Sequence, residues 1–77
     1  MLEDWILRKK EIEATKGNLK GIDLSNSKLM GARLGEADLT EADLSSAYLI
    51  KADLSKASLV NAALTQAVLS EAILVEA

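Results

Sequence analysis

Residues 32–56 read ARLGE, ADLTE, ADLSS, AYLIK and ADLSK, five units of five residues in one phase. Each unit begins with Ala and carries Leu at its third position. Outward from this stretch, the Leu spacing continues without a gap from Leu19 to Leu74, which makes twelve consecutive units. The last nine units begin with Ala, whereas the first three begin with Gly17, Ile22 and Ser27. Such an internal period marks a repeat architecture.

A period of five fits neither regular element. Five residues advance an α-helix by about 500°, so the Leu side chains would scatter around its axis. On a flat strand side chains alternate between two faces, so every second Leu would face water and forfeit roughly 1.5–3 kcal/mol. The chain must therefore bend once in every unit, so that each Leu returns to the inside.

A backbone that turns the same way at every unit closes into a coil. Successive coils then stack and pair as short parallel strands about 4.8 Å apart. A single long helix is the alternative, because Ala, Leu, Glu and Lys are good helix formers. It is disfavoured, since no 3.6-residue period is present from residue 17 and since Asp, Ser, Thr and Asn recur there.

Units 37–41, 42–46 and 52–56 resemble the A(D/N)LXX motif of the pentapeptide-repeat family, and the match spans residues 17–76. The resemblance implies an all-β fold, a right-handed quadrilateral parallel β-helix with four pentapeptides to a coil. It also implies that Leu and the small residue point inward while the other three positions point outward. Twelve units would then form about three coils, in a domain of residues 17–77. Two features depart from the family pattern: Phe is absent from the central positions, and Ile22 is bulky.

Under this fold, residues twenty apart stack on one another, which predicts four interior Leu columns. The columns are Leu19, Leu39 and Leu59; Leu24, Leu44 and Leu64; Leu29, Leu49 and Leu69; and Leu34, Leu54 and Leu74.

Residues 1–16 are expected to form an amphipathic helix that caps the first coil, since repeat proteins need covered ends. Its apolar face is predicted to contain Leu2, Trp5, Ile6 and Ile12. The charged residues fall mostly elsewhere: Lys9, Lys10, Glu11 and Glu13. Four acidic residues balance four basic ones in this segment, whereas a membrane-surface helix would carry excess positive charge.

The composition excludes several classes of function. The chain has no Cys and no His, so disulfides, zinc sites and Cys or His catalysis are ruled out. The recurring Asp residues lie on outward positions, and an Asp23–Asp43 pair lacks the ligand count of a calcium site. No catalytic, cofactor or metal site is therefore predicted. The net charge of −3 argues against nucleic-acid binding. Without a signal peptide or membrane span, a cytoplasmic location is expected.

The C-terminal units carry the most apolar outward positions and no cap follows them. The residues concerned are Val60, Val68, Ile73 and Val75. We expect a homodimer or an end-to-end contact there, and two-fold pairing would close the edge. A fragment of a longer repeat array, or continuation by a partner protein, would account for the same pattern.

Two functions remain. The first is a non-catalytic structural or protein-interaction module. The alternative is a DNA mimic that inhibits a topoisomerase, as the resemblance to acidic members of the family implies. Residues 17–77 carry eight acidic and five basic side chains, and three coils span only about 15 Å. Since duplex DNA carries one charge per about 1.7 Å, so short and weakly acidic a repeat is a poor mimic.

Overall fold

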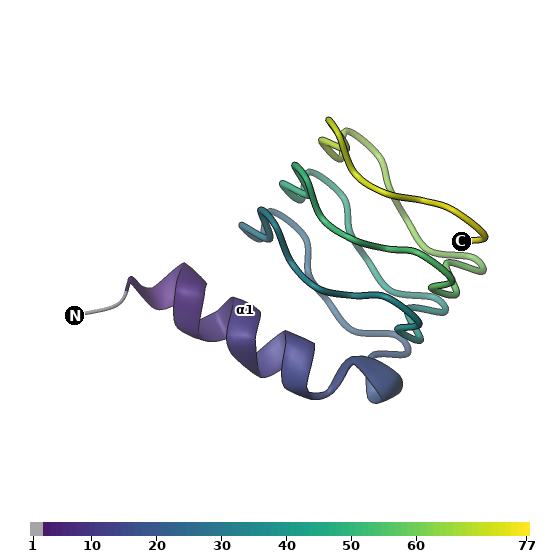
Figure 1. The fold of residues 1–77 in the computed structure, drawn as a ribbon, viewed down its shortest axis with the longest axis horizontal. Helices are drawn as coiled ribbons and strands as arrows, with labels where there is room; N and C mark the ends of the chain where they lie inside the picture. Colours follow the sequence, from purple (N-terminus) through teal and green to yellow (C-terminus); the bar gives the residue numbers. More distant parts are fainter. Residues whose placement is uncertain (1–2) are drawn as a thin grey trace.

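The structure is a computed structural model that describes residues 3–77 (Figure 1). An α-helix, α1 (Asp4–Ala14), is followed by a short 3-10 helix, η1 (Lys16–Asn18), and then by the repeats. Figure 1 shows the repeats as a stack of similar coils, with α1 against one end and the C-terminus at the other. Leu2, which was expected in the helical cap, lies outside the described residues.

The chain returns beside itself every twenty residues. Parallel bridges join residues of successive coils at that spacing: Asp23 to Asp43 and Asp43 to Ala63, Lys28 to Tyr48 and Tyr48 to Val68, Arg33 to Asp53 and Asp53 to Ile73, and Asp38 to Ser58. Four bridge columns separated by five residues give each coil four sides of one pentapeptide each. The twenty-residue spacing expected between stacked positions is therefore present at the residues that precede each Leu.

The expected short strands are not formed in residues 3–77, where each side contributes only a single bridge residue. The reason lies in the turns. In every unit from Leu19 onward, the N–H of the residue three places after Leu donates to the Leu carbonyl, as Ala37 does to Leu34 at 3.1 Å. This turn uses four of the five residues, so only the one before the next Leu is left to pair. The all-β description was wrong to that extent.

The third residue of each turn has a positive φ, which is the pattern of a type II turn. Two turns use glycine, Gly21 and Gly31. The other ten place an L-residue there, with φ of 58° to 64°: Asn26, Glu36, Glu41, Ser46, Lys51, Lys56, Asn61, Gln66, Glu71 and Glu76. A left-handed conformation costs about 1–2 kcal/mol for a residue with a Cβ. The repeat tolerates this strain in ten of its twelve units because the turn brings each Leu back inside.

We therefore predict that Lys51→Gly stabilises the protein by about 0.5–1 kcal/mol, the strain relieved less the entropic cost of glycine. Lys51 is exposed and has a φ of 60°. Lys51→Val should destabilise it, because a β-branched residue tolerates positive φ least. Urea unfolding measures both changes. The control is Lys28→Gly at a bridge position with ordinary φ, which should destabilise, and a loss of stability in Lys51→Gly would contradict the strain argument.

The core is a continuous filling of Leu and Ala. The Leu residues that are 0% exposed are Leu24, Leu29, Leu34, Leu39, Leu44, Leu49 and Leu54. Leu19 and the Ala residues from Ala32 to Ala57 at the first position of each unit are also buried, and Ile12 of α1 belongs to the same cluster. Ile22, the bulky residue of the first coil, is only partly buried against it. Burial is thus complete where a coil has a neighbour on both sides.

Candidate interaction surface

The core opens toward solvent at the coil of residues 58–77. Leu59, Leu64 and Leu69 are only partly buried there, and Leu74 is 42% exposed. Leu74 thus departs from the interior position expected for its column. The cause is geometric, since nothing among residues 3–77 stacks on this coil. A hollow of about 410 Å3 lies at the same end, with Ala57, Ser58, Leu59, Val60, Leu74 and Ala77 around it.

The backbone of this coil presents an unpaired edge. From Leu24 to Leu54 the N–H of each repeat Leu donates to the coil that follows, as Leu24 does to Asp43 at 2.8 Å. The N–H of the positive-φ residue in each of these turns does the same, as Glu41 does to Val60 at 2.8 Å. Within residues 3–77 the corresponding groups of the last coil have no backbone partner. The donors concerned are the N–H groups of Leu59, Asn61, Leu64, Gln66, Leu69, Glu71, Leu74 and Glu76. The acceptors are the carbonyls of Ala57, Ala62, Ala67, Ala72 and Ala77. Unpaired edges of this kind are ready to pair with another chain.

Apolar side chains surround the open end. Val60 and Val75 are 60% and 63% exposed, and Ile73 is also exposed, whereas Val68 is partly buried. The structure therefore places all four predicted residues on the last coil, three of them accessible. Tyr48, in the same bridge column as Val68, is also exposed, but it belongs to the preceding coil and lies outside the open end.

The opposite end is covered by α1 and η1. Ile12 is 1% exposed, while Trp5 and Ile6 are partly buried. The backbone N–H of Asp38 donates to the Lys16 carbonyl at 2.9 Å. The backbone N–H of Arg33 likewise donates to a carboxylate of this segment. In later coils the equivalent N–H groups donate to the coil before, so the N-terminal segment supplies the acceptors that a preceding coil would otherwise provide.

Two charged residues of α1 were missed as contacts. The Glu13 carboxylate accepts the Arg33 N–H at 2.7 Å, and the Lys9 ammonium donates to the Met30 carbonyl at 3.1 Å. The helical pattern predicted that both lie mostly away from the apolar face, which is wrong. They flank Ile12 on the side of α1 that meets the first coil, where backbone groups await partners. Their spacing of four residues is a signal that they share one face.

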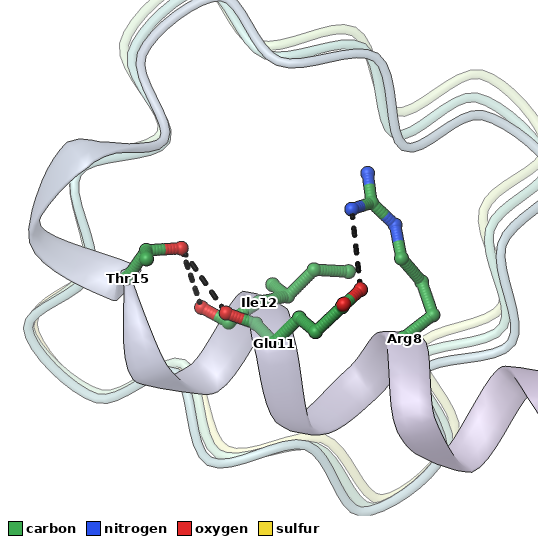
Figure 2. Close-up of polar contacts among 4 residues, drawn as sticks. All are labelled: Arg8, Glu11, Ile12 and Thr15. Atoms are coloured by element: carbon green, nitrogen blue, oxygen red, sulfur yellow. Dashed lines mark hydrogen bonds and ion pairs between the residues drawn. The ribbon is translucent and has the colours of Figure 1, made fainter.

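The C-terminal end of α1 is tied by Thr15, whose hydroxyl donates to the Glu11 and Ile12 carbonyls at 3.2 and 3.5 Å (Figure 2). The side chains of Arg8 and Glu11, one helical turn apart, form an exposed ion pair at 3.8 Å. Figure 2 also shows the coils lying over one another, with α1 crossing them. The Thr15 contacts fix the helix end beside Ile12, the residue that enters the core.

The recurring Asp residues bond to their own turns. The carboxylates of Asp38, Asp43 and Asp53 accept the N–H two residues later at 3.0–3.1 Å. For Asp53, the Ser55 hydroxyl donates as well, at 2.7 Å. These bonds to Ser55, the hydroxyl first and the N–H second, lower the pKa of Asp53 below its usual 3.8. These carboxylates are committed to hydrogen bonds within their own turns, and they are not arranged for proton transfer.

The lowered pKa of Asp53 predicts acid sensitivity. Because the folded-state pKa lies below the unfolded value, the stabilisation is present above pH about 4 and is lost as pH falls through the folded pKa. The thermal midpoint of Asp53→Asn, which keeps an acceptor oxygen, should therefore vary less with pH between about 5 and 2 than that of the wild type. Ser55→Ala should behave similarly, and parallel pH profiles of all three proteins would contradict the prediction.

No group of three acidic side chains within residues 3–77 is placed to hold a metal ion. In the same described part of the chain, α1 and η1 are both too short and too polar to cross a bilayer. A second hollow, of about 450 Å3, lies between α1 and the first coil, and Asp4, Trp5, Arg8, Asn26, Ser27 and Lys28 line it.

A family model for pentapeptide repeats matches the chain in eight copies, over residues 18–55 and 47–77. These matches cover the repeats described above and exclude α1. No curated protein matches the chain at a significant level.

Proposed function

Because the chain belongs to the pentapeptide-repeat family, we propose that it is a non-catalytic protein-interaction module that binds a second copy of itself through its open coil. The coil itself is proposed to be the right-handed quadrilateral β-helix that such repeats usually form. The observation that carries the proposal is the unpaired backbone edge of residues 58–77, beside a partly exposed Leu core.

The two ends of the stack differ, which favours a closed dimer over an open filament. Head-to-tail stacking would require the open coil to reach the first coil, where α1 lies. Two-fold pairing joins the two open ends and leaves α1 on the outside of each copy. A closed pair of this type is also the commonest assembly of identical chains.

Sedimentation velocity across the micromolar range tests the proposal. We expect a species of twice the 8.2 kDa chain mass, and a monomer for the double variant Val60→Lys, Val75→Lys. The lysines place like charges at the open end without touching the buried core. Tyr48→Lys is the matched control, since it replaces an exposed apolar residue one coil away and should leave the dimer intact. A wild-type protein that sediments as a monomer throughout would refute self-association.

A further inference from the structure

The hollow between α1 and the first coil, which we call the α1 hollow, has the size and the charge of a ligand site. Its volume of about 450 Å3 lies within the range of small-molecule sites in proteins, about 300–1,000 Å3. Of its charged lining residues, Arg8 and Lys28 are basic and Asp4 alone is acidic. This excess of positive charge favours an anionic ligand.

A backbone N–H beside the α1 hollow lacks a partner. In later coils the N–H at this position donates to a carbonyl of the coil before, as the N–H of Tyr48 does to Ser27 at 2.9 Å. Lys28 is the equivalent residue of the first coil, where α1 takes the place of a preceding coil. Within residues 3–77 the Lys28 N–H has no hydrogen-bond partner. It is directed to the side where α1 lies and is available to an acceptor in the hollow.

The next side of the same coil shows which acceptor suits such a group. Arg33 occupies the equivalent position one pentapeptide later, and its N–H donates to the Glu13 carboxylate at 2.7 Å. A hydrogen bond to a carboxylate is roughly twice as strong as one between neutral groups. At Lys28 none of the acidic residues in the described part of α1 plays this role. The Lys28 N–H is therefore a place for a carboxylate that the chain itself does not supply.

Two cationic side chains accompany this N–H. The Lys28 ammonium takes part in no ion pair within residues 3–77. Arg8 pairs only with Glu11, at 3.8 Å and with both side chains exposed, and such surface pairs contribute little to stability. The guanidinium has five N–H donors, so most of them remain available to a ligand. The Lys28 N–H and these two cations together suit one carboxylate.

Trp5 gives the α1 hollow an apolar wall. The indole is partly buried, and its N–H donates to the Glu3 carboxylate. The Lys9 ammonium lies 5.6 Å from the centroid of the ring and donates to the Met30 carbonyl at 3.1 Å. These contacts hold the ring beside the hollow. An aromatic group of a ligand can pack against such a ring, because aromatic pairs attract beyond the area that they bury.

We infer that the α1 hollow binds a small organic acid, whose carboxylate bonds to the Lys28 N–H between the Arg8 and Lys28 side chains and whose aromatic body packs against Trp5. The site does not depend on the proposed self-association, because the α1 hollow and the open coil lie at opposite ends of the stack (Figure 1).

Titration with phenylacetate tests the site, and Trp5 reports on it because it is the chain's one tryptophan. We expect a saturable change in Trp5 fluorescence and, in NMR spectra, a shift of the Lys28 amide that saturates at the same concentrations. Two matched probes separate the parts of the ligand. Phenylacetamide keeps the ring without the charge, and acetate keeps the charge without the ring. Each should bind about tenfold more weakly than phenylacetate.

Side-chain variants locate the carboxylate. Arg8→Met and Lys28→Met should each raise the Kd for phenylacetate about tenfold, since each removes one charge-assisted contact. Lys10→Met is the matched control, because Lys10 is exposed on the same helix but does not line the α1 hollow. It should leave the Kd unchanged. Circular dichroism of each variant shows that it remains folded.

A blocked dipeptide, acetyl-Asp-Phe-amide, distinguishes a free acid from a peptide that carries the same groups. Binding of phenylacetate at least as tight as that of the dipeptide supports a small organic acid. Tighter binding of the dipeptide would overturn it in favour of an acidic peptide. The absence of a saturable change with either probe, equal binding of phenylacetamide, or equal effects of Lys28→Met and Lys10→Met would overturn the carboxylate site altogether.

Discussion

Replacing Leu49 with lysine is expected to unfold the protein. Leu49 is 0% exposed, in the middle coil, with coils on both sides of it. The substitution removes a buried Leu and puts a charge in a filling of Leu and Ala that holds no buried polar side chain among residues 3–77. A domain of this length has a total stability of about 4–12 kcal/mol, which an unpaired buried charge can exhaust. Far-UV circular dichroism and urea unfolding measure the loss.

The control lies one residue away. Tyr48→Lys makes a similar change on the outer surface of the same side and should alter stability by less than about 1 kcal/mol. A folded Leu49→Lys with the stability of Tyr48→Lys would mean that Leu49 does not point into the coil, and the stacked arrangement would be wrong.

The second large effect is expected at α1. Ile12→Ala should cost about 2–5 kcal/mol, because Ile12 is 1% exposed and packs in the same cluster as the repeat Leu residues. The measurement is the free energy of unfolding in urea. The result would show that α1 contributes to the stability of the first coil, the capping role predicted for it.

Leu7→Ala is the matched control, because Leu7 lies on the same helix and is 48% exposed. It should cost less than about 1 kcal/mol. Equal effects of the two substitutions would indicate that α1 is not docked on the coil through Ile12, and the capping prediction would fail.

The period of five predicted that the chain bends once in every unit. It required each Leu to return to the inside, and the burial of Leu24 through Leu54 agrees with that requirement. Four units per coil could not be derived from the period, because a bend once in five residues does not fix the turn angle. That number came from the resemblance to pentapeptide repeats, and the bridges between residues twenty apart are consistent with it.

Other features depended on details that the pattern does not contain. The reduction of the strands to single bridges follows from the four-residue turn, which becomes evident only when the Leu carbonyl bonds are seen. The contacts of Lys9 and Glu13 depend on where the backbone groups of the first coil lie relative to α1. Helical spacing predicts which residues of a helix share a face. A charged residue beside the apolar face is predicted to face solvent, unless the group that it bonds to is known.

The sequence also indicated the unusual character of the last coil. Val60, Ile73 and Val75 are apolar at outward positions, and the structure leaves all three exposed. The backbone edge could not be read from residue types, because every unit has the same N–H and carbonyl groups. Whether they are paired depends on what stacks on the coil, and this is the property on which the proposed function rests.

Residue-resolved amide hydrogen exchange at two protein concentrations tests that property most directly. The N–H of Leu44 bonds to Ala63 within the chain and should be protected at both concentrations. The N–H groups of Leu59, Leu64, Leu69 and Leu74 should exchange quickly when the protein is dilute and become protected when it is concentrated enough to pair. Fast exchange of these four amides at every concentration would contradict association through the open coil.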